Sequence, residues 1–154
     1  MKNVLTALAL LLSFSSFAQT SRILIEGKFD DWQNISVAHE DGAGDEGSSD
    51  IDFRKLWIAN DESYLFLRLE VGKVMNLQSD NNIVMYLDTD DNPSTGISFN
   101  GIGAEITYNF GEHDGTARFG NNSYFLDHED IGLVTAPTVT SDVFEIAVRR
   151  DGTI

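Results

Sequence analysis

Hydrophobic and polar residues alternate one by one along much of this chain. The clearest case is residues 64–71, where four aliphatic side chains occupy every second position. An alternation with a period of two predicts a β-strand with two different faces. The aliphatic face consists of Leu65, Leu67, Leu69 and Val71, and the opposite face of Tyr64, Phe66, Arg68 and Glu70.

Similar patterns predict a series of short strands separated by polar turns. Beside residues 64–71, we expect strands at residues 23–26, 34–38, 53–59, 82–87, 104–110, 116–119, 123–126, 133–139 and 143–149. The turn at residues 60–62 is short enough to join its two strands into an antiparallel hairpin. No stretch after Gln19 shows the helical period of about 3.6 residues. The sequence therefore predicts an all-β fold, an antiparallel β-sandwich of the jelly-roll type.

The first 18 residues have the pattern of a secretory signal peptide. Lys2 supplies the positive end, residues 4–12 the apolar centre, and residues 16–18 a small-x-small cleavage site. A membrane anchor, the alternative, needs about 20 apolar residues, and this run is shorter. We expect a secreted or periplasmic protein whose domain spans residues 19–154. The sequence has no cysteine, so the domain contains no disulfide bond and cannot be anchored through a lipid-modified cysteine.

The chain is strongly acidic. It has 10 Lys and Arg against 25 Asp and Glu, which gives a formal net charge of −15. Such a charge repels nucleic acid and anionic membranes, so we expect neither as a partner. It favours bound cations instead.

The predicted strand at residues 82–87 runs directly into a loop rich in oxygen ligands. Asp88, Asp90 and Asn92 occupy every second position there, a spacing at which a tight loop can wrap around one hard cation such as Ca²⁺. The loop is not an EF-hand, because Pro93 and Phe99 stand where that motif needs Gly and Glu. The alternative interpretation is a plain turn, since turns use the same residue types.

A second acidic segment covers residues 40–52 and is rich in Gly and Ser. Its composition cannot form a core, so it predicts a solvated loop. The alternative is a second cation site formed by Asp41, Asp45 and either Asp50 or Asp52 with backbone carbonyls, because the glycines let the backbone curl inward.

No arrangement for catalysis is evident from the residues. His39, His113 and His128 lack the spacing of a zinc site, and no nucleophile, metalloprotease or phosphate-loop motif is present. Carboxylates are so frequent that no pair stands out for glycoside hydrolysis. We therefore expect this chain not to be an enzyme.

Aromatic side chains are the other candidate binding groups. Sugar rings stack on exposed aromatic rings, so Trp32, Trp57 and Tyr64 are candidates for carbohydrate contact. The alternative places both tryptophans in the core, because large aromatic residues dominate core packing. Tyr64 and Phe66 belong either to a groove or to the filling between sheets.

The last residues predict that the protein continues beyond this sequence. Asp151 and Gly152 are a typical hairpin turn, yet only two residues follow, and a returning strand needs about five. We expect a domain cut at its C-terminal end, followed by a downstream domain.

Several short motifs, taken in order, resemble the carbohydrate-binding module family 9-like and wider DOMON-like domains. The motifs are residues 25–27 with 29–32, 44–45 leading to 50–51, Trp57 with 60–61 and 64–66, 87–90 with Asn92 and 95–96, and 103–105. Their order and spacing cover nearly all of residues 19–154.

The resemblance implies a calcium-stabilised β-sandwich that serves as a non-catalytic, carbohydrate-binding accessory module, with Glu105 added to the metal ligands. True family 9 modules hold a terminal sugar between two tryptophans. Trp32 and Trp57 match only the opening motifs, and the chain has no further tryptophan. A second expectation is therefore a structural or interaction domain that positions a downstream hydrolase or nuclease-like domain. Some DOMON relatives bind haem, which Met75 or Met85 with His113 or His128 would hold.

Overall fold

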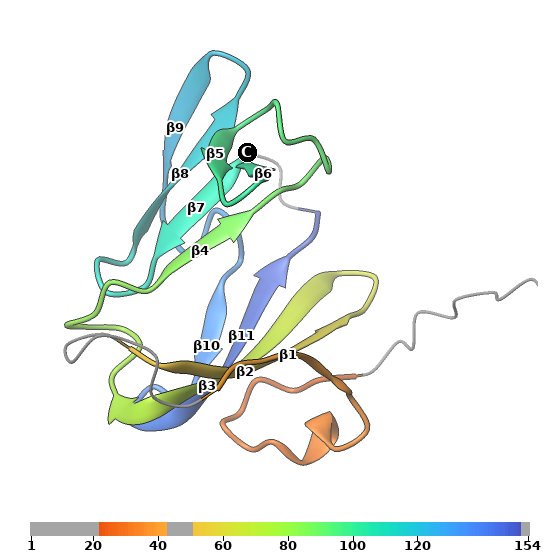
Figure 1. The fold of residues 1–154 in the computed structure, drawn as a ribbon, viewed down its shortest axis with the longest axis vertical. Helices are drawn as coiled ribbons and strands as arrows, with labels where there is room; N and C mark the ends of the chain where they lie inside the picture. The colour runs from red at the N-terminus through yellow and green to blue at the C-terminus, as the bar shows by residue number, and fades with distance from the viewer. Residues whose placement is uncertain (1–21, 43–50, 152–154) are drawn as a thin grey trace, which may run out of the picture.

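A computed structural model describes residues 22–42 and 51–151, and the predicted signal peptide lies outside these ranges. The described chain folds into short strands and one turn of 3-10 helix (Figure 1). The elements are η1 (Asp30–Trp32), β1 (Val37–Glu40), β2 (Phe53–Asn60), β3 (Tyr64–Met75), β4 (Val84–Leu87), β5 (Ile97–Phe99), β6 (Ile102–Ala104), β7 (Ile106–Asn109), β8 (Asp114–Phe119), β9 (Asn122–Leu126), β10 (Val134–Ala136) and β11 (Ser141–Arg149).

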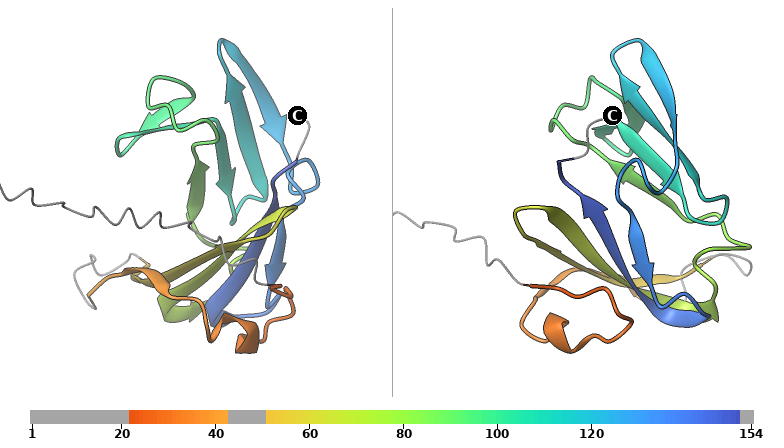
Figure 2. Two further views of the ribbon diagram at one scale, coloured as in Figure 1. Left: turned by 90° about the vertical axis from the view of Figure 1, so that its right-hand side faces the viewer. Right: turned by 180° about the vertical axis from the view of Figure 1, so that it is seen from behind.

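Two antiparallel sheets make up most of the molecule (Figure 2). The five-stranded sheet has the order β1-β2-β3-β11-β10, and the four-stranded sheet has the order β4-β7-β8-β9. A separate hairpin of β5 and β6 stands beside the four-stranded sheet. The predicted all-β class is confirmed.

The hairpin of β2 and β3 is confirmed as well. The Asp61 carboxylate accepts hydrogen bonds from the backbone N–H groups of Ser63 and Tyr64, at 2.8 and 2.7 Å. An aspartate that binds the backbone two and three residues later stabilises a tight turn. The turn sets the register in which Ile58 faces Leu67.

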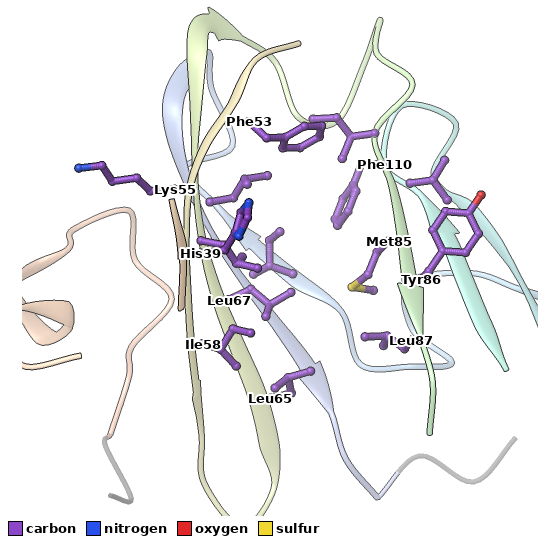
Figure 3. Close-up of a pocket in the computed structure, with 15 residues that line it drawn as sticks. His39, Phe53, Lys55, Ile58, Leu65, Leu67, Met85, Tyr86, Leu87 and Phe110 are labelled. Atoms are coloured by element: carbon purple, nitrogen blue, oxygen red, sulfur yellow. The ribbon is translucent and has the colours of Figure 1, made fainter. Parts of the chain in front are cut away.

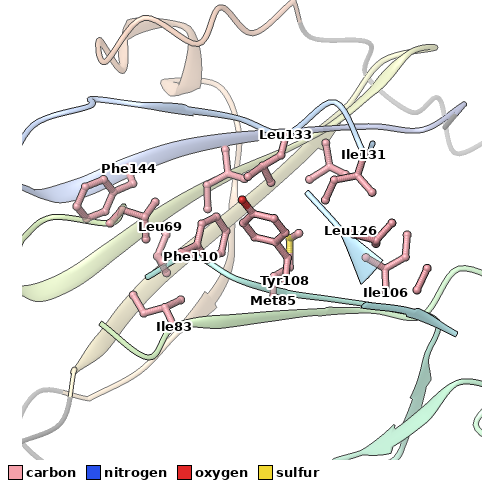
Figure 4. Packing of buried hydrophobic residues seen from close by; sticks show 14 of the residues in the cluster. Leu69, Ile83, Met85, Ile106, Tyr108, Phe110, Leu126, Ile131, Leu133 and Phe144 are labelled. Carbon is pink, nitrogen blue, oxygen red and sulfur yellow. The ribbon is translucent and has the colours of Figure 1, made fainter. Parts of the chain in front are cut away.

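The main core lies between the two sheets (Figure 4). Alternate residues of β3 and β11 point into it from the five-stranded sheet, and residues of β4 and β7 from the other, as their alternation predicted. Its most buried large members are Phe144, Leu77, Leu126 and Ile131. Burial of such side chains contributes about 1.5–3 kcal/mol each.

A second, smaller core covers the outer face of the five-stranded sheet. The N-terminal segment, residues 22–36, packs there through Ile23 and Trp32 against Trp57, Phe66 and Ala147. Phe66 thus lies under this segment and not between the sheets.

Glu145 on β11 fastens the N-terminal segment to the sheet. Its side chain is fully buried, and it accepts hydrogen bonds from Trp32 Nε1–H at 3.0 Å and from the backbone N–H groups of Glu26 and Gly27 at 3.1 and 2.9 Å. Burial raises the pKa of Glu145, with Asp31 adding to the effect, although the three donors oppose it. Because this carboxylate binds the backbone of residues 26–27, the strand predicted at residues 23–26 does not form, and that prediction was wrong.

Two further strand predictions need correction. The strand expected at residues 34–38 forms later, as β1. The strand expected at residues 104–110 is interrupted at Glu105, which separates β6 from β7. β5 and β6 themselves were not predicted, because their residues show no clear alternation. The break turns the Glu105 side chain towards the loop after β4.

The buried phenol of Tyr108 gives the fold a pH dependence. Burial, with Asp127 and Asp114 nearby, raises the pKa of Tyr108 above its usual value. A raised folded-state pKa means that its contribution is complete below the unfolded value of about 10 and is lost as the pH rises further. We expect the free energy of unfolding, measured with urea, to fall above about pH 10 in the wild type and to fall less in Tyr108→Phe. Equal losses in both proteins would contradict this assignment.

Candidate metal centre

Three carboxylates from two segments meet beyond the end of β4. One oxygen from each of Asp88, Asp90 and Glu105 lies within 4.8 Å of the others. Asp88 directly follows β4, whereas Glu105 comes from the break between β6 and β7. The structure therefore brings together two of the three predicted loop ligands and the residue that the family resemblance added.

Backbone donors hold Asp88 in place. Its carboxylate accepts hydrogen bonds from the N–H groups of Asp90, Asn92 and Gly103, each at 3.3 Å. Burial acts to raise the pKa of Asp88, but these donors outweigh it, so the pKa lies below its usual value. Asp88 is therefore ionised at neutral pH, and the three N–H donors hold its side chain in position.

Glu105 is the most deeply buried member, with 3 % of its surface exposed. Its Oε2 accepts hydrogen bonds from the Thr89 N–H at 2.9 Å and the Thr89 hydroxyl at 3.2 Å, but within the described residues its Oε1 has no hydrogen-bond partner. Burial raises the pKa of Glu105, yet the donors outweigh it and lower the pKa overall. A buried carboxylate oxygen without a partner costs free energy, and a cation at this position would remove that cost.

Asp90 and Asn92 are tied into the same loop. The Thr95 hydroxyl lies 3.0 and 3.1 Å from the two oxygens of Asp90, and the Asn92 N–H donates to Asp90 at 3.1 Å. The side-chain oxygen of Asn92 accepts a hydrogen bond from the Ser94 N–H at 3.1 Å. Asn92 thus shapes the loop, and its role as a metal ligand stays a prediction.

Two glycines let the loop fold back onto the β5–β6 hairpin. Gly96 has a φ of 62°, and a Cβ there would collide with the Ala104 carbonyl. A Cβ on Gly103 would collide with the carbonyls of Thr95 and Asn92. Glycine is the residue that tolerates both conditions, so these positions allow the loop to approach Glu105.

The structure describes only part of the second predicted cation site. Asp45 and Asp50 lie outside the described residues. Asp52 is buried and forms an ion pair with Arg54, with Nε and Oδ2 3.0 Å apart, while Asp41 is exposed and caps the N–H of Gly42. Arg54 pairs with Asp52 at one oxygen, and the second cation site stays a prediction because two of its proposed ligands lie outside the described residues.

The tryptophans predicted to contact sugar are buried. Trp32 is 1 % and Trp57 8 % exposed. Trp57 lies under the guanidinium of Arg68, 4.2 Å from the ring centre, and Tyr64 packs partly buried against the same core. The prediction of these tryptophans as binding residues needs correction, because Trp32 is itself part of the N-terminal segment that packs over Trp57 on the outer face of the sheet.

Sequence reasoning missed a row of residues on the outer face of the four-stranded sheet. Tyr86, Thr107, Thr116 and Phe125 pair in sequence across its four strands. We call these four residues the outer-face row. Phe125 is 73 % exposed, and Tyr86 stacks on Phe99 with ring centres 3.9 Å apart. The alternation of residues 123–126 could have revealed Phe125, because Leu126 points inward.

Two of the histidines that looked scattered in the sequence line one pocket. His113 and His128 lie there with Gln78 and Thr135, and an imidazole nitrogen of His113 contacts the Gln78 carbonyl. No methionine lines this pocket, and Met85 packs into the main core. Nothing in this geometry assembles the methionine and histidine pair of a haem site.

In the part of the chain that the structure describes, no helix is long and apolar enough to cross a membrane. Comparison of the chain with models of known families, with curated proteins and with solved structures gave no match.

Proposed function

We propose that this chain is a non-catalytic β-sandwich module of a secreted protein, stabilised by one Ca²⁺ held by Asp88, Asp90 and Glu105. The observation that carries the proposal is the buried Oε1 of Glu105, which has no hydrogen-bond partner among the described residues and belongs to a cluster with the side chains of Asp88 and Asp90. The donors are all hard oxygens, which suit Ca²⁺ or Mg²⁺ and not Zn²⁺, whose structural sites use Cys and His. An irregular loop that supplies carboxylates favours Ca²⁺, because Mg²⁺ demands near-ideal octahedral geometry.

The ion's role in this proposal is structural. Its ligands come from the loop after β4 and from the junction of β6 and β7. A bound cation would therefore cross-link two segments that are separated by the β5–β6 hairpin. Metal binding to a folded site adds directly to the free energy of unfolding.

We further propose that the module binds carbohydrate on the outer-face row. Phe125 offers an exposed aromatic ring, and Thr107 and Thr116 stand between it and Tyr86 in the row, where they supply hydroxyl groups. Aromatic faces and hydroxyl groups are suited to the C–H and O–H groups of a sugar. The row crosses four strands, a span of about 14 Å between its end residues, which accommodates a short oligosaccharide.

Replacement of Phe125 with alanine tests the carbohydrate proposal. In affinity electrophoresis against plant, algal and bacterial polysaccharides, we expect the wild type to be retarded by at least one. Phe125→Ala should bind it about tenfold more weakly, since a stacked aromatic ring contributes about 0.5–1.5 kcal/mol beyond its buried area. Phe53→Ala, the same change on the opposite sheet, should bind normally. Silence of the wild type on all polysaccharides would refute sugar binding.

A second candidate function is a structural or interaction domain that positions a downstream secreted hydrolase or nuclease-like domain. The observation that favours it is the structural use of both tryptophans, which pack under the N-terminal segment. A protein that gains stability from calcium but binds no polysaccharide would match this candidate and not the first.

A further inference from the structure

An apolar groove runs along the edge of β4 that faces away from β7 (Figure 3). One wall is formed by Met85 and Leu87 of β4 with Phe110, the residue after β7, and the other by β2 and β3, with Ile58, Leu65 and Leu67. Its volume is about 460 Å³. Tyr86 also borders the groove, but its ring points to the outer face of the four-stranded sheet.

The groove exists because the two sheets differ in width. Ile58, Leu67 and Ile146 form one cross-strand row on the inner face of the five-stranded sheet. Ile58 is 46 % exposed, Leu67 is half-buried, and Ile146 is 2 % exposed. The four-stranded sheet thus covers β11 but ends before it covers β2.

The groove continues the interface between the sheets. Leu69, Ile83, Met85, Phe110 and Ile146 line the groove and also belong to the main core. Apolar side chains placed in the groove would therefore extend an existing core and not form an isolated contact.

The backbone at the groove selects the kind of occupant. β4 pairs with β7 along one edge, and within residues 22–42 and 51–151 no strand pairs with its other edge. Unpaired N–H and C=O groups on an edge strand are a template for another strand. A strand paired there would lie about 4.8 Å from β4 and about 10 Å above β2 and β3, so its alternate side chains would point into the groove.

We propose that this groove binds an extended segment of a different polypeptide, which adds to the four-stranded sheet as a strand beside β4. Its inward residues are apolar and fill the space over Ile58 and Leu65. Its outward residues are basic, because the chain carries a net charge of −15. Lys55 at the rim does not oppose this, since its Nζ is paired with Glu40 at 3.2 Å.

The test uses the peptide Lys-Val-Lys-Ile-Lys-Val-Lys, blocked at both ends, and a control of equal composition without alternation, Lys-Lys-Val-Ile-Val-Lys-Lys. We expect the first to bind with a Kd below about 1 mM in fluorescence anisotropy, and to slow hydrogen exchange of amides in residues 84–87. The control peptide should bind at least about tenfold more weakly, because only alternation presents all three apolar residues to one face.

Two matched variants locate the site. Ile58→Lys places a charge on the groove floor and should weaken binding at least about tenfold. Val134→Lys makes the same charge change at an exposed position, 50 % accessible, on the opposite edge strand β10, and should leave binding unchanged. Equal binding to both variants, unaltered exchange in β4, or sedimentation as a dimer that protects β4 in the absence of peptide would each overturn the proposal.

Discussion

Replacing Trp32 with alanine is expected to destabilise the protein by about 3–5 kcal/mol, the usual cost of truncating a buried large aromatic residue. Trp32 is the anchor of the N-terminal segment and is 1 % exposed. The substitution leaves a cavity in the second, smaller core and also removes the only side-chain donor to Glu145 found among the described residues. A buried carboxylate that loses a donor becomes more costly to keep ionised.

Urea denaturation measures this effect. Trp32→Phe should be less harmful, because it keeps most of the apolar area and loses only the indole N–H. Phe125→Ala, an aromatic truncation at an exposed position, should change the free energy of unfolding by less than about 0.5 kcal/mol. A loss below about 1 kcal/mol for Trp32→Ala would show that the N-terminal segment contributes little to the folded state.

Calcium is expected to raise the melting temperature by several degrees. At a concentration one hundred times its Kd, a ligand that binds only the folded state adds about 2.7 kcal/mol. For a domain of this size, that corresponds to a rise of about 5–10 °C. Differential scanning calorimetry in EDTA and in calcium measures the difference.

The variant Glu105→Gln separates metal binding from ordinary packing. The amide keeps one oxygen for the Thr89 donors, but it removes the negative charge from the unpartnered position. In EDTA we expect this variant to be about as stable as the wild type, because neutralising one of three clustered carboxylates reduces the repulsion between their negative charges. In calcium it should gain less than about 1 °C. Asp142→Asn, which changes an exposed acid on β11, should respond to calcium like the wild type.

The sequence allowed the strands with two different faces to be predicted. Residues 64–71 alternate because one face fills the main core and the other lies under the N-terminal segment. β11 alternates for the same reason, and both predictions agree closely with the structure. The prediction failed at residues 23–26, where Glu145, distant in sequence, binds the backbone and replaces the ladder of a strand.

The candidate site was predicted only in part. Asp88 and Asp90 are visible as a local pattern after a strand, whereas Glu105 is brought to them by the unpredicted β5–β6 hairpin. The burial of Trp32 depends on which face of the sheet the N-terminal segment covers. The groove depends on the relative widths of two sheets. Neither property is encoded in local alternation.

Isothermal titration calorimetry with calcium tests the central claim most directly. The wild type, first stripped with EDTA and dialysed, is predicted to bind one Ca²⁺ at the site formed by Asp88, Asp90 and Glu105. Asp88→Asn and Glu105→Gln should each lose this binding, while Asp142→Asn retains it. No heat of binding in the wild type at millimolar calcium, or undiminished binding in Glu105→Gln, would contradict the account.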